Sequence, residues 1–305
     1  MIVKKFYKIY NSIVDRNSLL KKIRFYSLCR FIIRSIANLV LPIYFKYYAA
    51  NEADKSCEMT IVSLTSFPKR INKVWLVIEC LMRQDLRPAR IILWLSKDQF
   101  SDIDALPQSI KSQIKRGLDV RLVEGDIRSH KKYYYAFNEY YDYNIITVDD
   151  DMYYPEDFIK TLIYSGLNKP GAVICCYART LKRKEGVLLP YNTWDRAING
   201  CNSVNELFFG SGGGTLFPSG ALYKDSLKID LFLRLTPLAD DIWLNAMCRL
   251  NRTSIEYIQF ITGYLPINIA NNETLASKNL DEDLNNKQIE NVNNYYQEQG
   301  KKVFV

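Results

Sequence analysis

The stretch NIITVDDDMYYPEDF, residues 144–158, runs from β-branched residues into three adjacent aspartates and then into a helix-like segment. Residues 144–148 predict a buried strand, so Asp149, Asp150 and Asp151 stand where that strand ends. Two carboxylates ~4 Å apart repel by about 4 kcal/mol at an effective dielectric near 20. The cluster therefore needs either full solvation or a compensating positive charge.

Composition limits the chemistry that this chain can support. Its 305 residues are 48% hydrophobic, which is enough for a packed core of one large or two small domains. Seven cysteines without a C-x-x-C pair argue against a disulfide framework and favour a reduced, cytoplasmic setting. His130 is the single histidine, which leaves no histidine zinc site and argues against a Ser-His-Asp triad. Any metal is expected to be held by oxygen.

Positive charge is concentrated at the N-terminus. Residues 1–50 hold ten Lys and Arg against one acidic residue, a sum of +9, which leaves about −1 of the total +8 for the rest. Between Arg34 and Lys46 lie 11 uncharged residues, fewer than the about 20 that span a bilayer. We interpret residues 1–50 as a basic amphipathic, membrane-associating helical arm on an anionic surface. The alternative is a helix packed on the body with a solvated basic face.

The body alternates strand-like and helix-like segments. Strands are predicted at 60–66, 90–96, 120–126 and 144–148, and helical spacing occurs over 71–82, 103–116 and 132–141. Such alternation predicts right-handed βαβ units and a mainly parallel sheet flanked by helices, a Rossmann-like α/β fold. Residues 51–59 are polar and predict a linker. Neither a G-x-G-x-x-G fingerprint after the first strand nor a P-loop is present.

Polar clusters follow three of these strands and are expected to face one crevice, since ligands bind at the carboxyl ends of strands in such sheets. The aspartates form one cluster. Asp149 and Asp151 are candidates to hold a divalent cation whose shell a diphosphate completes. The alternatives are that the three aspartates are simply solvated in a loop, or that one of them caps the helix that begins near Pro155.

Four motifs in order resemble GT-A glycosyltransferases over residues 58–270. They are TIVSLTSFPKRI (60–71), VDDDMYYP (148–155), GSGGGTLFPSG (210–220) and PLADDIWLNAM (237–247). The resemblance is closest to bacterial family-2-like enzymes that build capsule and O-antigen polysaccharides. It implies a GT-A sheet, Mn²⁺ or Mg²⁺ on Asp149 and Asp151, and Asp150 near the sugar or ribose.

The same resemblance places base and ribose contacts on the loop after the first strand, and the loop after the third strand carries further candidates by the chemistry of its side chains. The first loop offers Thr65, Ser66 and Arg70, or it is an ordinary βα loop in which Lys69 and Arg70 are solvated. After the third strand, an acidic side chain, Asp126, suits a base or ribose hydrogen bond. Lys131 and Lys132 suit a phosphate, or are simply an exposed helix start.

Two later motifs complete the predicted site. The glycine-rich run 210–214 suits a pocket wall, with Gly213 as its candidate residue, or else a β-bulge or tight turn. Asp240 and Asp241 begin a helical pattern, and capping alone would account for Asp240. In the related inverting enzymes an acidic pair here supplies the general base, for which Asp241 is our candidate. Trp243 is expected either to stack on a sugar or to be buried.

The predicted function is a metal-dependent glycosyltransferase that moves a sugar, preferably from a UDP-sugar, to a lipid-linked glycan, with inversion. The protein is expected to be cytoplasmic and peripheral on the inner face of the cell membrane. Because no Q-x-x-R-W segment is present, one sugar per event is expected. Two alternatives remain, a nucleotidyltransferase acting on sugar phosphates and a nucleic-acid-binding protein using the arm, although no nucleic-acid motif occurs. The polar tail, 271–305, predicts a surface helix near 285–298 without chemistry.

Overall fold

The computed structural model describes residues 2–13, 25–48, 56–197, 206–260, 264–269 and 283–304. All four predicted strands are present. They are β1 (Ser56–Thr65), β2 (Arg87–Ser96), β3 (Leu118–Val123) and β4 (Asn144–Val148). Residues 56–59 belong to β1, where Ser56 and Cys57 pair with β2, so this part of the predicted linker is wrong. Residues 51–55 of that linker lie outside the described chain.

The connections between these strands are helical, as predicted. They contain α4 (Ile71–Met82), α5 (Gln108–Ile114) and α6 (Lys131–Glu139), and α7 (Phe158–Asn168) follows β4. The helix predicted over 103–116 is shorter because Pro107 immediately precedes its first residue. The faces of α4 and α7 that meet the sheet carry buried aliphatic side chains, among them Val74, Ile78 and Leu162.

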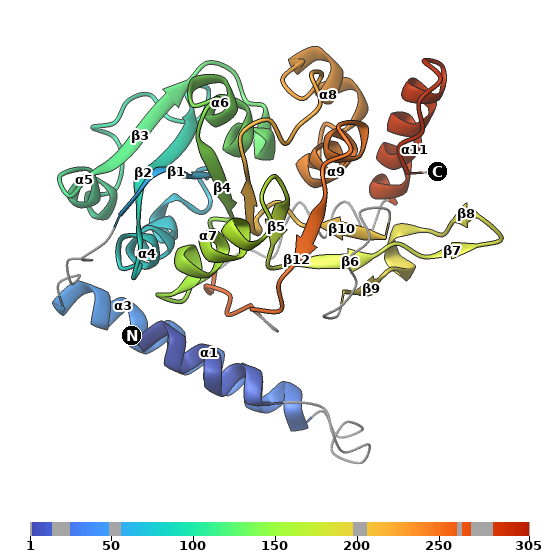
Figure 1. The fold of residues 1–305 in the computed structure, drawn as a ribbon. Coiled ribbons are helices and arrows are strands. Elements are labelled where there is room, and N and C mark those ends of the chain that lie inside the picture. Colours follow the sequence, from blue (N-terminus) through green and yellow to red (C-terminus); the bar gives the residue numbers. More distant parts are fainter. Residues whose placement is uncertain are drawn as a thin grey trace.

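The central sheet has seven strands in the order β12-β5-β11-β4-β1-β2-β3 (Figure 1). Its other members are β5 (Val173–Cys175), β11 (Gly213–Phe217) and β12 (Ile255–Tyr257). Only β11 runs antiparallel to its neighbours, β4 and β5, among the pairs of this sheet. The remaining pairs are parallel, which confirms the predicted Rossmann-like, mainly parallel α/β sheet flanked by helices.

A second layer of structure stands beside the β5 and β12 edge. It contains a small sheet, β10-β6-β9, and a β7–β8 hairpin. The strands are β6 (Ala178–Thr180), β7 (Arg183–Lys184), β8 (Val187–Leu188), β9 (Asp195–Arg196) and β10 (Leu207–Phe209). The helices are α8 (Ile229–Leu235), α9 (Asp240–Leu250) and α11 (Leu284–Gln297). Helix α11 falls in the tail near the predicted position, and its Ile289, Val292 and Tyr296 are buried in the core of this layer.

Two N-terminal helices, α1 (Ile2–Ser12) and α3 (Phe25–Tyr47), lie along each other on one side of the molecule (Figure 1). Their inner faces join the main core. The buried residues are Val3 and Tyr7 of α1, and Ala37, Leu41 and Phe45 of α3. The two helices therefore pack on the body, which is one part of the alternative prediction. The outer face of α3 is largely apolar and not the solvated basic face of that alternative.

Candidate active site

Every residue predicted for the site lines one cavity of about 720 Å³. The predicted residues in its wall are Thr65, Ser66, Arg70, Asp126, Lys131, Lys132, Asp149, Asp150, Asp151, Gly213, Asp240 and Asp241. The cavity opens where β1 and β4 end and β11 and α9 begin. The expectation that the loops after three parallel strands would converge is therefore confirmed as geometry.

The turn after β4 is held by a guanidinium group. Arg70 Nη1 is 2.5 Å from Asp150 Oδ1 and 2.9 Å from Asp151 Oδ2. The buried Asp150 also accepts a hydrogen bond from Ser66 Oγ at 2.6 Å. Burial raises the pKa of Asp150 above its ordinary value, although Arg70 and Ser66 oppose that shift. The neighbouring hydroxyl of Thr65 donates to the Trp94 carbonyl oxygen at 2.8 Å.

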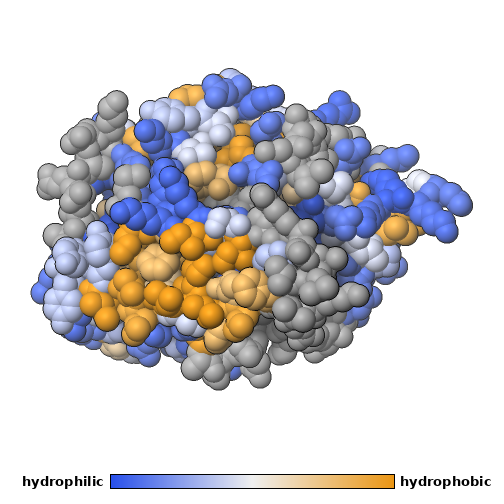
Figure 2. Space-filling view, turned by 90° about the horizontal axis from the view of Figure 1, so that it is seen from below, coloured by the Kyte–Doolittle hydropathy of each residue, from blue (hydrophilic) through white to orange (hydrophobic). Residues whose placement is uncertain are grey.

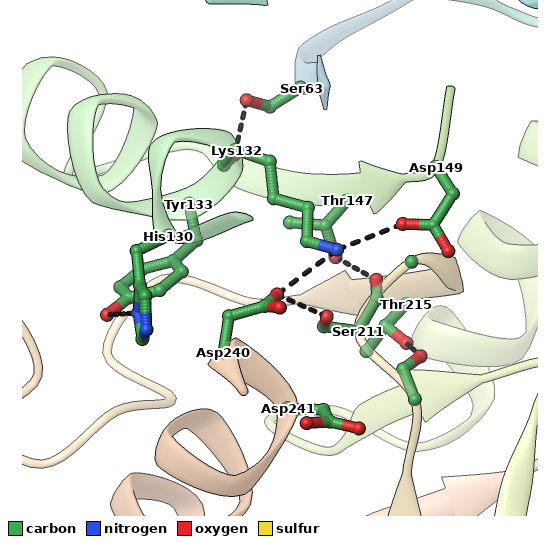
Figure 3. Close-up of polar contacts among 12 residues, drawn as sticks. Ser63, His130, Lys132, Tyr133, Thr147, Asp149, Ser211, Thr215, Asp240 and Asp241 are labelled. Carbon is green, nitrogen blue, oxygen red and sulfur yellow. Dashed lines mark hydrogen bonds and ion pairs between the residues drawn. The ribbon is translucent and has the colours of Figure 1, made fainter. Parts of the chain in front are cut away.

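Lys132 provides the second cation (Figure 3). Its buried Nζ lies 3.0 Å from Asp149 Oδ1 and 3.1 Å from Asp240 Oδ2. Burial alone would lower the pKa of Lys132, but the two carboxylates raise it well above its usual range. Lys131 is buried too and pairs with Asp126, so the two lysines are not an exposed helix start. The aspartate cluster is thus balanced in part by the chain's own cations.

Asp149 and Asp151 can still serve a divalent cation. Burial, and then the charge of Asp149, raise the pKa of Asp151 to about 7, so these two oxygen donors lie close enough to repel. Within the described residues, no cluster of three or more His, Cys, Asp or Glu side chains could hold a metal ion. Mg²⁺ commonly uses one or two carboxylates together with substrate phosphates. The residues therefore fit a cation that arrives with a diphosphate, and they do not fit a site made by protein alone.

The glycine-rich run forms both of the features expected of it. A bulge interrupts the pairing of β11 with β4 between Gly213 and Thr215. A Cβ atom on Gly212 would lie 1.7 Å from Asp149 Oδ1, and one on Gly213 would lie 2.2 Å from the Tyr264 hydroxyl. Asp149 N–H donates to the Gly212 carbonyl oxygen at 2.9 Å. Glycine is required here because the carboxylate packs directly on the backbone.

The acidic pair at the start of α9 is split into two different environments. Asp240 is buried and accepts a hydrogen bond from Ser211 Oγ at 2.5 Å. Burial opposes ionisation of Asp240, but the charge of Lys132 and the hydrogen bond from Ser211 contribute to a net lowering of its pKa. Burial and the charge of Asp240 raise the pKa of Asp241 to about 7. The α9 N-cap residue is Ala239, and no side-chain cap hydrogen bond is present, so capping does not account for Asp240.

Trp243 and the single histidine, His130, both have structural roles. Trp243 is fully buried and donates from Nε1 to the Ser226 carbonyl oxygen at 2.9 Å, so it stacks on no ligand. His130 is buried against Phe232, with 4.4 Å between ring centres. Its Nε2 donates to the Thr236 carbonyl oxygen at 2.7 Å, and burial lowers its pKa to about 4. A neutral, packed imidazole of this kind is not available to a metal.

Sequence reasoning missed one wall of the cavity, which the second layer provides. Tyr177, Arg179 and Tyr191 line it, and the Arg179 guanidinium lies 5.1 Å from the centre of the Tyr191 ring. Tyr177 and Tyr264 are in ring contact at 5.7 Å between centres. These residues stand in short, irregular strands and turns, where no hydrophobic period marks them. The mixture of aromatic and basic side chains was the only available signal.

Comparison with known proteins finds similarity in structure alone. No family model matches the chain, and no curated protein matches it. Among solved structures it is similar to the mannosyltransferase PcManGT from Pyrobaculum calidifontis in complex with GDP-Man and Mn²⁺, at 11% identity and a TM-score of 0.40, covering 90% of this chain and 72% of that chain. It is also similar to S. aureus TarS 1-349 in complex with UDP-GlcNAc, at 14% identity and a TM-score of 0.43, covering 73% and 60%.

A structure of another class has similar scores. It is a putative glucose-1-phosphate thymidylyltransferase from Bacillus anthracis, at 11% identity and a TM-score of 0.35, covering 67% of this chain and 85% of that chain. Likenesses at this level identify no family and no substrate. A function has to be argued from the side chains in the cavity.

Proposed function

We propose that this chain is a glycosyltransferase that transfers a sugar from a nucleotide-sugar donor to an acceptor hydroxyl. One observation carries the proposal: the aspartates after β4, the acidic pair of α9, and the cations Arg70 and Lys132 meet in a single cavity. Its volume of about 720 Å³ lies within the range of roughly 300–1,000 Å³ that small-molecule sites occupy. A UDP-sugar is our preferred donor.

The donor end of the site is assigned to the turn after β4. Asp149 and Asp151 would hold Mn²⁺ or Mg²⁺, which when bound would offset the negative charge of the departing diphosphate. Arg70 and Lys132 keep these carboxylates oriented. Asp126, Lys131 and the hydroxyls of Thr65 and Ser66 are assigned to the nucleoside.

The acceptor end is assigned to Asp241. A general base works best when its pKa lies near the operating pH, and burial beside Asp240 brings the pKa of Asp241 to about 7. Asp240 stays ionised because Lys132 and Ser211 contact it. Asp241 would take the acceptor's hydroxyl proton, and direct displacement at the sugar carbon would invert its configuration. The proposed acceptor is a lipid-linked glycan at the inner face of the cell membrane, as the motif resemblance and the basic N-terminus suggest.

A thermal-shift panel tests the donor assignment. UDP, GDP, CMP and ATP are each added with and without Mn²⁺ to the native chain and to Asp149→Asn/Asp151→Asn. At about 100 times its Kd, a ligand adds roughly 2.7 kcal/mol, which moves the melt of a domain of this size by several degrees. We expect UDP with Mn²⁺ to raise the native melting temperature and to leave the double variant unchanged. Asp142→Asn, an exposed aspartate outside the cavity, is the matched control.

The outcomes separate the two transferase classes. Failure of every nucleotide to stabilise the native chain would reject the donor site altogether. A nucleotidyltransferase would instead bind a nucleoside triphosphate and release pyrophosphate when given a sugar phosphate. The loop after β1 lacks glycines, and its Arg70 is engaged by Asp150 and Asp151, so we expect no pyrophosphate release.

A further inference from the structure

The outer face of α3 is apolar although its inner face already belongs to the core. The outward side chains recur every three or four residues along the helix and are 46–73% exposed; they are Leu28, Ile32, Ile36, Leu39, Ile43 and Tyr47. Phe31 and, on α1, Ile9 extend the same surface, at 61% and 53% exposed. Figure 2 shows a continuous hydrophobic area on this side of the molecule. Exposed apolar patches of this kind mark protein-binding or membrane-binding surfaces.

The charges of the two helices indicate what that partner is. Helices α1 and α3 contain three basic residues each, six in total, and no acidic residue. Lys5, Lys8 and Lys46 are among the exposed residues. A second copy of the chain would bring two such positive surfaces together, which is unfavourable. Nucleic acid would meet a broad apolar stripe where phosphate binding needs cations. An anionic lipid surface can bind both the apolar side chains and the basic residues.

Contacts on the inner side hold α3 against the body. Asn38 Nδ2 donates to the Pro266 carbonyl oxygen at 3.0 Å, and Asn268 N–H donates to Asn38 Oδ1 at 2.8 Å. Arg34 Nε donates to Asn268 Oδ1 at 2.8 Å. Within the described chain, α3 is long and apolar enough to cross a membrane by length and composition. If α3 crossed a membrane, it would have to leave the body of the protein. The polar contacts of Asn38 and Arg34 and the packing of Leu41 in the core would then be lost.

We propose that α1 and α3 form a monotopic membrane-binding surface, with α3 lying in the interface of an anionic bilayer and its outer side chains inserted among the lipids. The proposal rests on exposure and charge, and it does not depend on the transferase assignment. The surface is joined to the body near the site, because α1 and α3 share the main core and the Tyr7 hydroxyl of α1 donates to the Tyr153 carbonyl oxygen at 2.6 Å, two residues after Asp151. Membrane attachment would therefore hold the cavity at a set position above the lipid.

Vesicle flotation of the full-length chain tests the surface. The probes are phosphatidylcholine vesicles with and without about one-third phosphatidylglycerol, and the variant is Phe31→Glu/Leu39→Glu. The variant removes the burial of two large apolar side chains in lipid, so it should lose at least about tenfold in partitioning. Leu167→Glu is the matched control, since Leu167 of α7 is 68% exposed but lies on another helix. Lys5→Gln/Lys8→Gln/Lys46→Gln should cost about fivefold per lysine on anionic vesicles only.

Each outcome bears on the proposal. Native binding that prefers anionic vesicles, weakens with salt and is lost in Phe31→Glu/Leu39→Glu but kept in Leu167→Glu would support it. No flotation of the native chain, or equal flotation of both glutamate variants, would overturn it. A concentration-dependent dimer in light scattering that Phe31→Glu/Leu39→Glu dissociates, without vesicle binding, would assign the surface to a second copy. Deleting residues 1–50 is not used, because the inner faces of these helices are part of the core.

Discussion

Lys132 joins two carboxylates that come from distant parts of the chain, with its Nζ 3.0 Å from Asp149 and 3.1 Å from Asp240. Asp149 follows β4, whereas Asp240 begins α9 in the second layer. Lys132 and Asp240 are buried, whereas the Asp149 side chain is 39% exposed to the cavity. A buried charge without a partner is expensive. This lysine therefore couples the proposed donor and acceptor ends of the site.

Replacing Lys132 should be costly for stability. Lys132→Met leaves both carboxylates facing each other without a cation, and breaking a buried pair costs about 3–5 kcal/mol. Lys169→Met is the control, because the exposed Lys169 stands 3.9 Å from Glu256 and such pairs contribute about 0–1 kcal/mol. Urea unfolding measures both, and Asp240→Asn added to Lys132→Met should recover part of the loss. Equal costs for the two lysine variants would contradict the coupling.

Asp241 should show opposite effects on stability and turnover. Its folded pKa of about 7 lies above the unfolded value near 3.9, so folding favours the protonated form, and stability falls as pH rises from about 4 to about 7. As pH rises through this window, the free energy of unfolding of Asp241→Asn should therefore rise by on the order of 1–3 kcal/mol relative to that of the native chain. The difference should persist above about pH 7. Turnover should fall by at least about a hundredfold. Urea unfolding between pH 4 and pH 8 checks the sign, and a pH-independent difference would refute it.

Gly212 should be needed for the turn that holds Asp149, Asp150 and Asp151, and not for the fold in general. Gly212→Ala places a Cβ atom 1.7–2.0 Å from the Asp149 carboxylate group, so the carboxylate must move. We expect the Mn²⁺-dependent shift with UDP to disappear. Gly117→Ala is the comparison, because its φ of +102° makes any side chain strained while the residue lies outside the cavity. That variant should lose stability of about 1 kcal/mol and keep the shift. Retention of the shift in Gly212→Ala would show that Asp149 is dispensable.

Tyr7 of the N-terminal helix α1 should stabilise the turn after β4 that holds the three aspartates. Its buried hydroxyl donates to the Tyr153 carbonyl oxygen and accepts from Leu265 N–H at 3.1 Å. Tyr7→Phe leaves both groups without that partner, which costs about 1–3 kcal/mol. Ile267 N–H donates to the Asp151 carbonyl oxygen, so the segment that contains Leu265 also contacts the aspartates, and the UDP shift should weaken. Tyr10→Phe on the same helix should do neither; a similar loss there would point to a general effect of α1.

The parallel strands of the sheet could be predicted well from the sequence, and the second layer could not. Residues 144–148 and 90–96 are uninterrupted buried runs between turn residues, and such runs predict strands without knowledge of their partners. The placement of β11 could not be predicted in this way, because it inserts antiparallel between β4 and β5 through contacts distant in sequence. A glycine-rich segment indicates only that space is needed.

The candidate site shows the same division. Convergence of the loops followed from strand order, since carboxyl ends of parallel strands share one edge. The burial of Lys132 did not follow, because only the folded chain brings Asp149 and Asp240 to opposite sides of its ammonium group. Arg179 was missed because β6 has three residues, too few to carry a period, and Tyr177 lies in the irregular segment just before that strand. The packing of α1 and α3 was left open for a similar reason: both faces of α3 are apolar.

The most direct test of the central claim is the electron paramagnetic resonance signal of free Mn²⁺, titrated with the full-length chain in the presence and absence of UDP. Asp149→Asn/Asp151→Asn is measured beside the native protein. The account predicts that the native chain removes free Mn²⁺ strongly only when UDP is present, because two carboxylates need the diphosphate to complete the metal shell. The double variant should leave the signal as UDP alone leaves it. Equal depletion by both proteins, or none by the native chain with UDP, would contradict a metal–diphosphate site on these aspartates.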